Sequence, residues 1–286
     1  MLFIGIDIGT TSVCGLAFDL ISRKYDVVTL YNKANLISSN TWEKIQDPEQ
    51  ILSVVEGILK KFCDKNDFIS GIGLTGQMNG ILYTDDNGNA VSPLYTWEDK
   101  RGNQIYRDGQ SYAGFLSALT SYQAASGFGL VTHFYNLKNG LVPHVATRLC
   151  TIMDYIVMKL TGNKFPLIDP TNAASLGFFD IRKLIFDKES ILESGIHPGM
   201  LPEVGPSGTF SGLYNGYIPV YSAIGDNQAS FLGSVNDIDS SVLVNIGTGS
   251  QISVFNEEFV STESLDIRPF PGGGYLRVGA ALYGGK

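Results

Sequence analysis

The sequence predicts a mixed α/β fold in which short strand hairpins come first and helices follow them. Two runs of β-branched and apolar residues each end in a glycine-rich phrase with hydroxyl side chains, GIDIGTTS at 5–12 and NIGTGSQ at 245–251. Between them, residues 48–63 repeat apolar side chains every three or four positions, which is typical of an amphipathic helix. The 286 residues suffice for roughly two ordinary domains.

The first third of the chain alternates strands with one well-marked helix. Asp47 is placed to cap that helix, because Pro48 stands at its first turn and Gln50 follows three positions after the cap. A hairpin is expected at 81–91, turned at an Asn-Gly pair. Apolar runs predict early strands at 1–9, 12–20, 24–32 and 68–74.

Strand and helix patterns also alternate toward the end of the chain. A strand runs into a helix over 146–162, which Gly162 stops, and a strand, a turn and a helix follow one another over 217–234. A last hairpin is expected at 240–258. The stretch Asn-Asp-Ile-Asp after residue 235 closes the first domain. The predicted domains are therefore 1–238, and 239–286 as the start of a second domain.

Composition narrows the classes of function. The net charge is −8, and the 20 lysines and arginines form no basic block, so nucleic acid and anionic membranes are not expected partners. The 3 cysteines are far apart, which gives neither a disulfide framework nor a zinc site. The N-terminus lacks a signal-peptide pattern and no apolar run is long enough to span a membrane, so we expect a cytoplasmic protein.

One glycine motif is discarded. Gly71, Gly73 and Gly76 match the spacing of a dinucleotide-binding turn. That turn must open a helix whose N-terminus holds the pyrophosphate, whereas the sequence predicts a strand and a hairpin next. The match is therefore interpreted as accidental.

The repeated phrase favours a phosphate-binding turn. A glycine at the end of a strand lets phosphate approach backbone N–H groups, and hydroxyl side chains add donors. Either phrase alone is equally typical of an ordinary turn, but the pair would hold the phosphates of a nucleotide from two sides. Asp7, just before the first phrase, is placed to hold Mg²⁺ through water. The candidate phosphate-binding residues are Gly9, Thr10, Thr11 and Ser12, with Gly247, Thr248, Gly249 and Ser250.

Five motifs in order give the chain a family resemblance. GIDIGTTS, GQMNG, WEDKR, GDNQAS and NIGTGSQ together resemble the FGGY carbohydrate kinases, which belong to the actin, Hsp70 and sugar kinase superfamily. The segments ASGFG, DYIVMKLTG and PTNAASLGFFD are most similar to the members that phosphorylate sedoheptulose. The resemblance implies two ribonuclease-H-like domains facing each other across a nucleotide cleft, with ATP and Mg²⁺ as cofactors.

The phrase GDNQAS carries the expected chemistry. From local sequence alone, Asp226 could be only the cap of the following helix. The resemblance implies that Asp226 is the base that takes the proton of the sugar hydroxyl as it attacks the γ-phosphorus of ATP. It also implies that Asn227 binds the sugar hydroxyls. Phosphoryl transfer needs little more than a positioned acceptor, Mg²⁺ and phosphate clamps.

Two segments are expected to line the sugar site. By residue type alone, Met78 and Trp97 fit a packed core equally well, and the charges after Trp97 fit a solvated helix start. The resemblance places both segments at a ketose site, although Asn79 stands where the family usually has histidine, which puts the substrate preference in question. The candidate substrate-binding residues are Gln77, Met78, Asn79, Trp97, Asp99, Arg101 and Asn227.

Two hypotheses of different class follow. The first is an ATP-dependent ketose kinase, with sedoheptulose favoured and xylulose or another ketose or polyol as the alternative. The second is a nucleotide switch or sugar-binding regulator of the same fold without kinase activity; a homodimer is compatible with either. Because the family's second domain continues well beyond the GGYLRVGAALYGGK segment, we expect the 286-residue chain alone to have negligible kinase activity.

Overall fold

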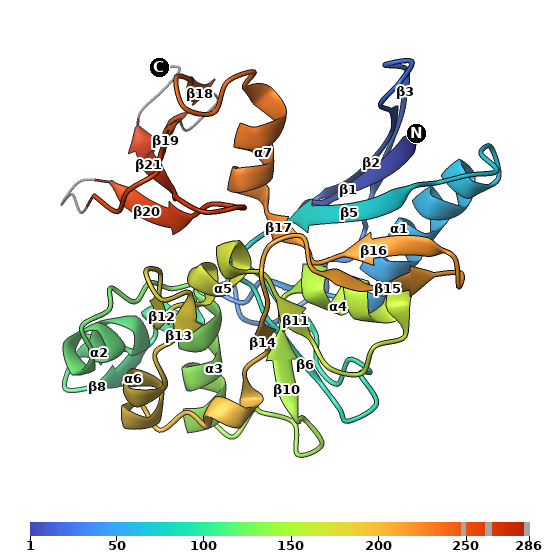
Figure 1. Cartoon of the computed structure of the whole chain (residues 1–286). Coiled ribbons are helices and arrows are strands. Elements are labelled where there is room, and N and C mark those ends of the chain that lie inside the picture. The colour runs from blue at the N-terminus through green and yellow to red at the C-terminus, as the bar shows by residue number, and fades with distance from the viewer. Residues whose placement is uncertain (247–249, 261–264, 283–286) are drawn as a thin grey trace.

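The computed structural model describes residues 1–246, 250–260 and 265–282 of the chain. Figure 1 shows a strand-rich part, a helical part below it and a second small sheet, with helix α7 (Asp226–Ser234) leading to that sheet. Within the described residues, no helix combines the length and the hydrophobicity that crossing a membrane requires.

The main sheet follows the order β15-β16-β5-β1-β2-β3, and β17 pairs with β5 beside β16. Strand β1 is antiparallel to β2 and parallel to β5, and β5 is parallel to both β16 and β17. Three parallel strands thus run side by side through its centre. The strands are β1 (Leu2–Ile8), β2 (Ser12–Asp19), β3 (Tyr25–Tyr31), β5 (Gly71–Gly76), β15 (Phe210–Tyr214), β16 (Ile218–Tyr221) and β17 (Ile224–Gly225).

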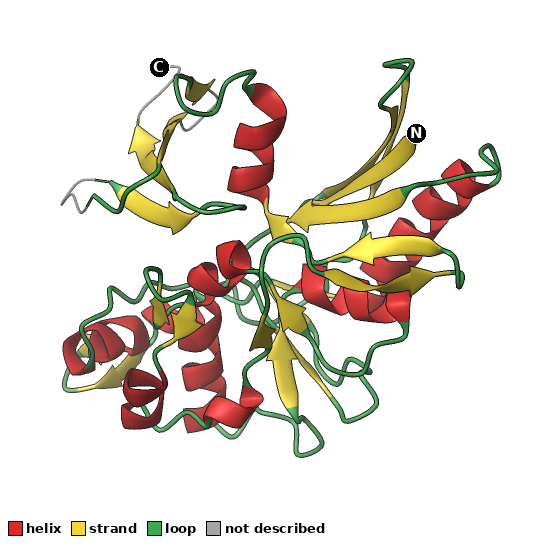
Figure 2. Ribbon diagram, viewed as in Figure 1, coloured by secondary structure: helices red, strands yellow, loops and turns green. Residues whose placement is uncertain are grey.

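Two helices, α1 (Pro48–Cys63) and α4 (Ile152–Thr161), cover one face of this sheet (Figure 2). Successive side chains of a strand point to opposite faces of the sheet. Ile4, Ile6 and Ile8 of β1 therefore all point into the core between the sheet and these helices, where each is almost fully buried. The residues between point to the other face, and Asp7 is one of them. The pleat therefore keeps the Asp7 carboxylate out of the apolar core.

The helical part has its own core of aromatic and aliphatic side chains, including Phe134 and Phe178. Its helices are α2 (Tyr112–Leu119), α3 (Gly129–Lys138), α5 (Pro170–Leu176) and α6 (Lys188–Glu193), with 3₁₀ turns at Arg101–Asn103 and Pro198–Met200. Its strands form two-residue or three-residue pairs: β4 (Ile45–Gln46) with β7 (Leu94–Tyr95), β6 (Leu82–Thr84) with β10 (Arg148–Cys150), β8 (Ile105–Arg107) with β9 (Gln110–Ser111), β11 (Leu167–Ile168) with β14 (Glu203–Val204), and β12 (Phe179–Asp180) with β13 (Ile185–Phe186).

The second sheet has the order β18-β19-β21-β20, with antiparallel pairing throughout. Phe231 of α7 packs into a small core with Phe270, Leu276 and Val278 of this sheet. The helix that follows β17 is thus tied to both sheets. The strands are β18 (Val242–Ile246), β19 (Ser250–Asn256), β20 (Asp266–Pro269) and β21 (Tyr275–Leu282).

The predicted mixed α/β fold is confirmed, and so are its best-marked elements. Asp47 caps α1 with its side chain, and Gly162 ends α4 in a left-handed conformation. The hairpin expected at 81–91 forms, because the N–H of Val91 donates to the Tyr83 carbonyl oxygen at 2.9 Å and Thr84 bridges Ala90 in antiparallel fashion. Strand β6 also pairs with β10. Helices α2, α3, α5 and α6 lie in segments where no helix was expected from the sequence pattern.

Candidate active site

The candidate site lies at the edge of the main sheet where the parallel strands β1, β5 and β17 end. Asp7 of β1 pairs in register with Thr75 of β5, which pairs in turn with Ile224 of β17. Because parallel strands end at a common edge, the residues just beyond them gather there. This register brings Asp7 and the start of the segment that leads to Asp226 to the same edge.

The two carboxylates are electrostatically coupled. Burial raises the pKa of Asp226, and the negative charge of Asp7 raises it further, while hydrogen bonds from Asn227 and the positive charge of Arg268 oppose the rise. Partial desolvation by neighbouring groups also raises the pKa of Asp7, although the residue keeps exposed surface. Both groups therefore hold a proton more strongly than a free carboxylate does, which is a property of general bases in enzyme sites.

Asp226 does not occupy the cap position of helix α7. Gly225 is the cap residue and makes no side-chain hydrogen bond, while Asp226 is the first residue of the helix itself. The Asp226 carboxylate accepts a hydrogen bond from the amide of Asn227 at 2.9 Å. The interpretation of Asp226 as a mere helix cap is therefore wrong.

The first glycine-rich phrase forms the turn between β1 and β2. The N–H of Gly9 donates to the carbonyl oxygen of Ser12 at 2.9 Å, and a Cβ on Gly9 would lie 2.9 Å from that same oxygen. Asn32 donates to the carbonyl oxygens of Gly9 and Thr10 at 3.1 and 2.8 Å, and Gln46 donates to that of Thr10 at 2.6 Å. The side chains of Asn32 and Gln46 thus fix the backbone of the turn, and Thr11 stays exposed.

Part of the second phrase falls outside the described residues, namely Gly247, Thr248 and Gly249; Ser250 begins β19. The flanking strands pair as expected, with Asn245 opposite Gln251. Gln251 donates to the side-chain oxygen of Asn227 at 2.7 Å. This contact links the second phrase to the residue next to Asp226.

The segment after β5 turns toward the same edge. Gln77 is buried and donates to the side-chain oxygen of Gln46 at 3.0 Å, while the Met78 sulfur lies 3.8 Å from the amide nitrogen of Asn227. Asn79 is partly exposed and has a φ of 73°, a left-handed conformation that asparagine tolerates better than most residues.

Trp97 lies against the first glycine-rich turn. Its indole N–H donates to the hydroxyl oxygen of Thr10 at 3.0 Å, and 51% of the residue is exposed. An exposed aromatic ring that is fixed by its one polar atom presents a flat apolar surface beside the site. The structure thus joins Trp97 to the group formed by Asp7, Thr10, Gln77, Met78, Asp226 and Asn227.

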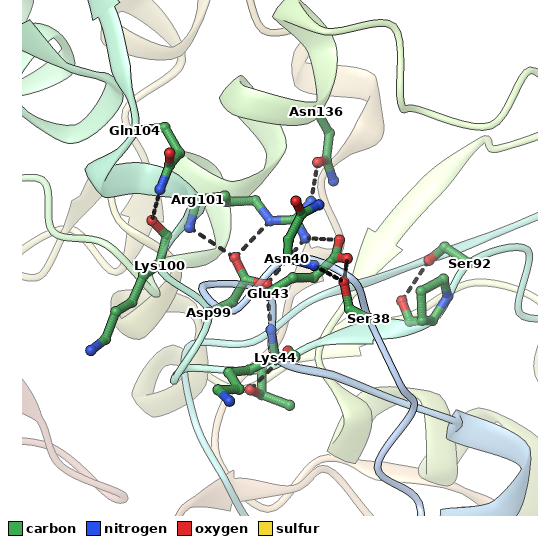
Figure 3. Close-up of polar contacts among 12 residues, drawn as sticks. Ser38, Asn40, Glu43, Lys44, Ser92, Asp99, Lys100, Arg101, Gln104 and Asn136 are labelled. Atoms are coloured by element: carbon green, nitrogen blue, oxygen red, sulfur yellow. Dashed lines mark hydrogen bonds and ion pairs between the residues drawn. The ribbon is translucent and has the colours of Figure 1, made fainter.

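Asp99 and Arg101 form a buried ion pair instead of an open surface (Figure 3). Arg101 Nε lies 2.7 Å from Asp99 Oδ1, and the residues are 1% and 0% exposed. Arg101 also pairs with Glu43 at 2.9 Å, donates to Asn136 and lies over the ring of Tyr95 at 4.1 Å. Its donors are thus occupied by the protein.

This cluster is connected to the site through the backbone of one segment. Asp99 accepts from the N–H of Lys44 at 2.9 Å, and Gln46, two residues further on, reaches the Thr10 carbonyl and Gln77. The sequence interpretation missed Asn32, Glu43 and Gln46. Nothing in their local sequence distinguishes them from ordinary polar residues.

The donor set suits a hard cation and a polyphosphate. Mg²⁺ usually takes one or two carboxylates together with waters and phosphate oxygens, and Asp7 is an exposed carboxylate beside a turn with hydroxyl side chains. No group of three or more His, Cys, Asp or Glu side chains that could hold a metal occurs in the part of the chain that the structure describes. A protein-only metal cage is therefore not the arrangement found there.

Comparison with known proteins gives a family match over most of the chain. The model of the N-terminal domain of the FGGY family of carbohydrate kinases matches residues 2–233. A sedoheptulokinase from Mus musculus is 29% identical over 99% of this chain and 66% of its own length. A xylulose kinase from Staphylococcus xylosus is 31% identical over 88% of this chain and 55% of its own length. The chain thus spans between about half and two thirds of the length of these relatives.

Solved structures of sugar kinases share the fold. A gluconate kinase from Lactobacillus acidophilus superposes with a TM-score of 0.85 at 22% identity, over 98% of this chain and 59% of that one. A xylulose kinase from Rhodospirillum rubrum also gives a TM-score of 0.85, at 21% identity, over 99% of this chain and 61% of that one. The predicted actin-like sugar kinase fold is confirmed.

Proposed function

Because this chain belongs to the FGGY family of carbohydrate kinases, we propose that, at the full length of its relatives, the protein transfers the γ-phosphate of ATP to the terminal hydroxyl of a ketose. The observation that supports this proposal most directly is the pair of coupled carboxylates, Asp7 and Asp226, at one sheet edge. A cytoplasmic location, where ATP is abundant, accords with this reaction.

Asp226 acts as the general base. The sugar oxygen attacks the γ-phosphorus, a new O–P bond forms, the bond from the γ-phosphorus to the bridging oxygen breaks, and ADP leaves. The proton of the sugar hydroxyl passes to the Asp226 carboxylate. Its raised pKa makes it a stronger base than a free aspartate carboxylate.

Asp7 and the first glycine-rich turn serve the phosphates. Mg²⁺ would be held near Asp7 and would neutralise charge on the phosphate oxygens. The hydroxyls and N–H groups of residues 10–12 offer donors to phosphate from one side, while the Gly9 N–H closes the turn on Ser12 and Gly9 leaves room for the phosphate. We propose that Gly247, Thr248, Gly249 and Ser250 do so from the other side, with residues 1–238 and 239–286 belonging to two domains.

The ketose is bound by the segments 77–79 and 97–101 with Asn227. Met78, Trp97 and Asn227 lie next to the carboxylate site through the contacts described above. Asp99 and Arg101 support this surface from inside the protein, because their charged atoms are engaged with one another. The ketose hydroxyls thus meet amide groups and one aromatic face.

Sedoheptulose is the favoured substrate, and xylulose is the second candidate because a xylulose kinase is also among the similar proteins. The two are separated by comparing kcat/KM for both sugars in one preparation. A single contact worth about 1–3 kcal/mol changes kcat/KM by roughly 5- to 150-fold, so a real preference should be at least about fivefold.

The base assignment is tested by Asp226→Asn in the protein at full length. Asparagine keeps the size of the side chain but cannot take the proton, so turnover should fall by about 10²–10⁴-fold. The ketose Kd should stay within about threefold, because amide contacts replace most of the binding. Asp237→Asn, in the exposed turn after the same helix, is the matched control and should keep parental turnover.

The unmodified parent protein tests whether the protein is a ketose kinase at all. Its ADP production should rise when a ketose of five to seven carbons is added. If no such ketose changes ADP production, the nucleotide switch or sugar-binding regulator replaces the kinase. A folded Asp226→Asn variant with turnover within about threefold of the parent would remove Asp226 from the role of base.

A further inference from the structure

Helix α5 is hydrogen-bonded to the backbone segment that precedes Asp226. These hydrogen bonds do not involve the Asp226 carboxylate. Thr171 and Asn172, in its first turn, both reach the segment 223–225 that precedes Asp226. The hydroxyl oxygen of Thr171 accepts from the N–H of Gly225 at 2.9 Å, and Asn172 donates to the carbonyl oxygen of Ala223 at 2.9 Å.

The direction of the Thr171 contact is fixed by a third group. Asp169, the cap residue of α5, is fully buried, and its Oδ1 accepts from the Thr171 N–H at 2.8 Å and the Thr171 hydroxyl at 2.6 Å. A hydroxyl has a single proton. Because that proton is given to Asp169, the oxygen lone pairs face Gly225, whose N–H can only donate.

The segment before Asp226 is held at successive residues from two sides. Besides the contacts to Ala223 and Gly225, Thr75 of β5 donates to the carbonyl oxygen of Ile224 at 2.9 Å. Gly225 caps helix α7 with no side chain of its own. The direction in which α7 leaves the sheet, and with it the direction of the Asp226 carboxylate, is therefore set by these external hydrogen bonds.

The same helix also holds the predicted sugar segment. The hydroxyl of Ser175 accepts from the N–H of Asn79 at 3.0 Å and donates to the carbonyl oxygen of Asn172 at 2.7 Å. Helix α5 thus bonds to the backbone on both sides of the site. Its first turn is hydrogen-bonded to the segment 223–225, and its last turn is hydrogen-bonded to the segment 77–79.

We propose that Thr171, oriented by Asp169, is a positioning residue for the base: its hydroxyl oxygen fixes the Gly225 N–H and so aims Asp226 at the sugar hydroxyl. This inference rests on the proposed function of Asp226. A displacement of about 1 Å between reacting groups can cost about 10²-fold in rate, so a remote hydrogen bond of this kind has a measurable effect on turnover.

The test replaces Thr171 in the protein at full length. Thr171→Val keeps the shape but removes the acceptor, and kcat should fall roughly 10- to 100-fold while the ketose Kd changes by less than about threefold. Thr171→Ser keeps the oxygen and should restore kcat to within about threefold of the parent. Thr161→Val, which removes a hydroxyl bonded to Val157 of α4, is the matched control and should keep parental kcat.

A second measurement needs no activity. Amide hydrogen exchange at Gly225 should become at least about tenfold faster in Thr171→Val than in the parent, and should stay near parental in Thr171→Ser. Thr171→Cys, whose sulfur is a weak acceptor, should give intermediate values and serves if the valine variant does not fold.

The outcomes separate this inference from the proposed function. A parent protein without ketose-dependent ADP production contradicts the function, whereas the exchange measurement still tests the Thr171 contact. The inference is overturned if folded Thr171→Val keeps kcat within about threefold of the parent, if Thr171→Ser loses as much as Thr171→Val, or if the loss appears only in ketose binding.

Discussion

Replacing Arg101 by methionine should destabilise the whole protein instead of removing one sugar contact. Arg101 is among the largest fully buried side chains, and its guanidinium pairs with Asp99 and Glu43. Methionine has similar length and fills most of the space, but it leaves the Asp99 carboxylate without its cation. The change therefore tests whether this pair acts on the fold or on the ketose.

The expected magnitude follows from what Asp99 retains. Only two donors to its carboxylate survive, the N–H groups of Lys44 at 2.9 Å and of residue 101 at 3.0 Å. Removing one partner of a buried ion pair costs about 3–5 kcal/mol of the free energy of unfolding. At about 2–4 °C for each kcal/mol, the melting temperature should fall by about 6–20 °C.

The assay is thermal unfolding together with urea unfolding at pH 7. Lys65→Met is the matched control, because Lys65 and its partner Asp26 are both exposed and such a pair is worth about 0–1 kcal/mol. The double change Asp99→Leu with Arg101→Met should recover much of the loss, because the fully buried carboxylate is then removed and only the partly exposed Glu43 loses its partner. A parental melting temperature combined with a tenfold higher KM for the ketose would refute this reasoning.

Two further predictions concern stability. Burial raises the pKa of Asp154 to about 7, so the folded state binds its proton more tightly than the unfolded state and stability falls as pH rises from about 4 to about 7. Asp154→Asn removes this pH-dependent contribution to the free energy of unfolding. In urea unfolding, the free energy of unfolding of the variant minus that of the parent should therefore be larger at pH 8 than at pH 5. An equal difference at both pH values would contradict this prediction. A Cβ on Gly76 would lie 2.5 Å from the Ile8 carbonyl oxygen, so Gly76→Ala should cost about 1–3 kcal/mol. Gly73→Ala, with nothing within 4 Å of the added Cβ, should cost less, and equal melting temperatures would refute the steric argument.

The sequence could indicate those parts of the site that depend on local pattern. Asp7 follows a buried run and precedes a glycine, and Asp226 stands where a strand passes into a helix, so each is marked by its immediate neighbours. The early hairpin strands and helix α1 were predictable for the same reason, because hairpins and amphipathic helices are local signals. No strand was predicted at β15, an outer strand of the main sheet. The register that brings both carboxylates to one edge requires strands far apart in the chain.

The supporting residues could not be found in this way. Gln46 reaches the Thr10 carbonyl across 36 positions, and Thr171 reaches Gly225 across 54. Polar side chains of this kind have no periodicity, because their role is set by a single tertiary contact. The same holds for charged residues. Glu43, which pairs with Arg101, lies 58 positions away from it in the sequence. Residue type alone therefore did not distinguish a solvated helix start from a buried ion pair.

Asn79 illustrates why fold and substrate preference separate at this site. Its φ of 73° lies in the left-handed region, where asparagine and histidine are both enriched, so the backbone accepts either residue. Its N–H is held by Ser175, a contact that does not depend on the side chain. The difference from the family's usual histidine therefore falls on the partly exposed side chain alone. An amide donates and accepts with a reach similar to that of an imidazole but places its polar atoms differently. The difference should therefore appear in the ratio of kcat/KM between ketoses and leave the fold unchanged.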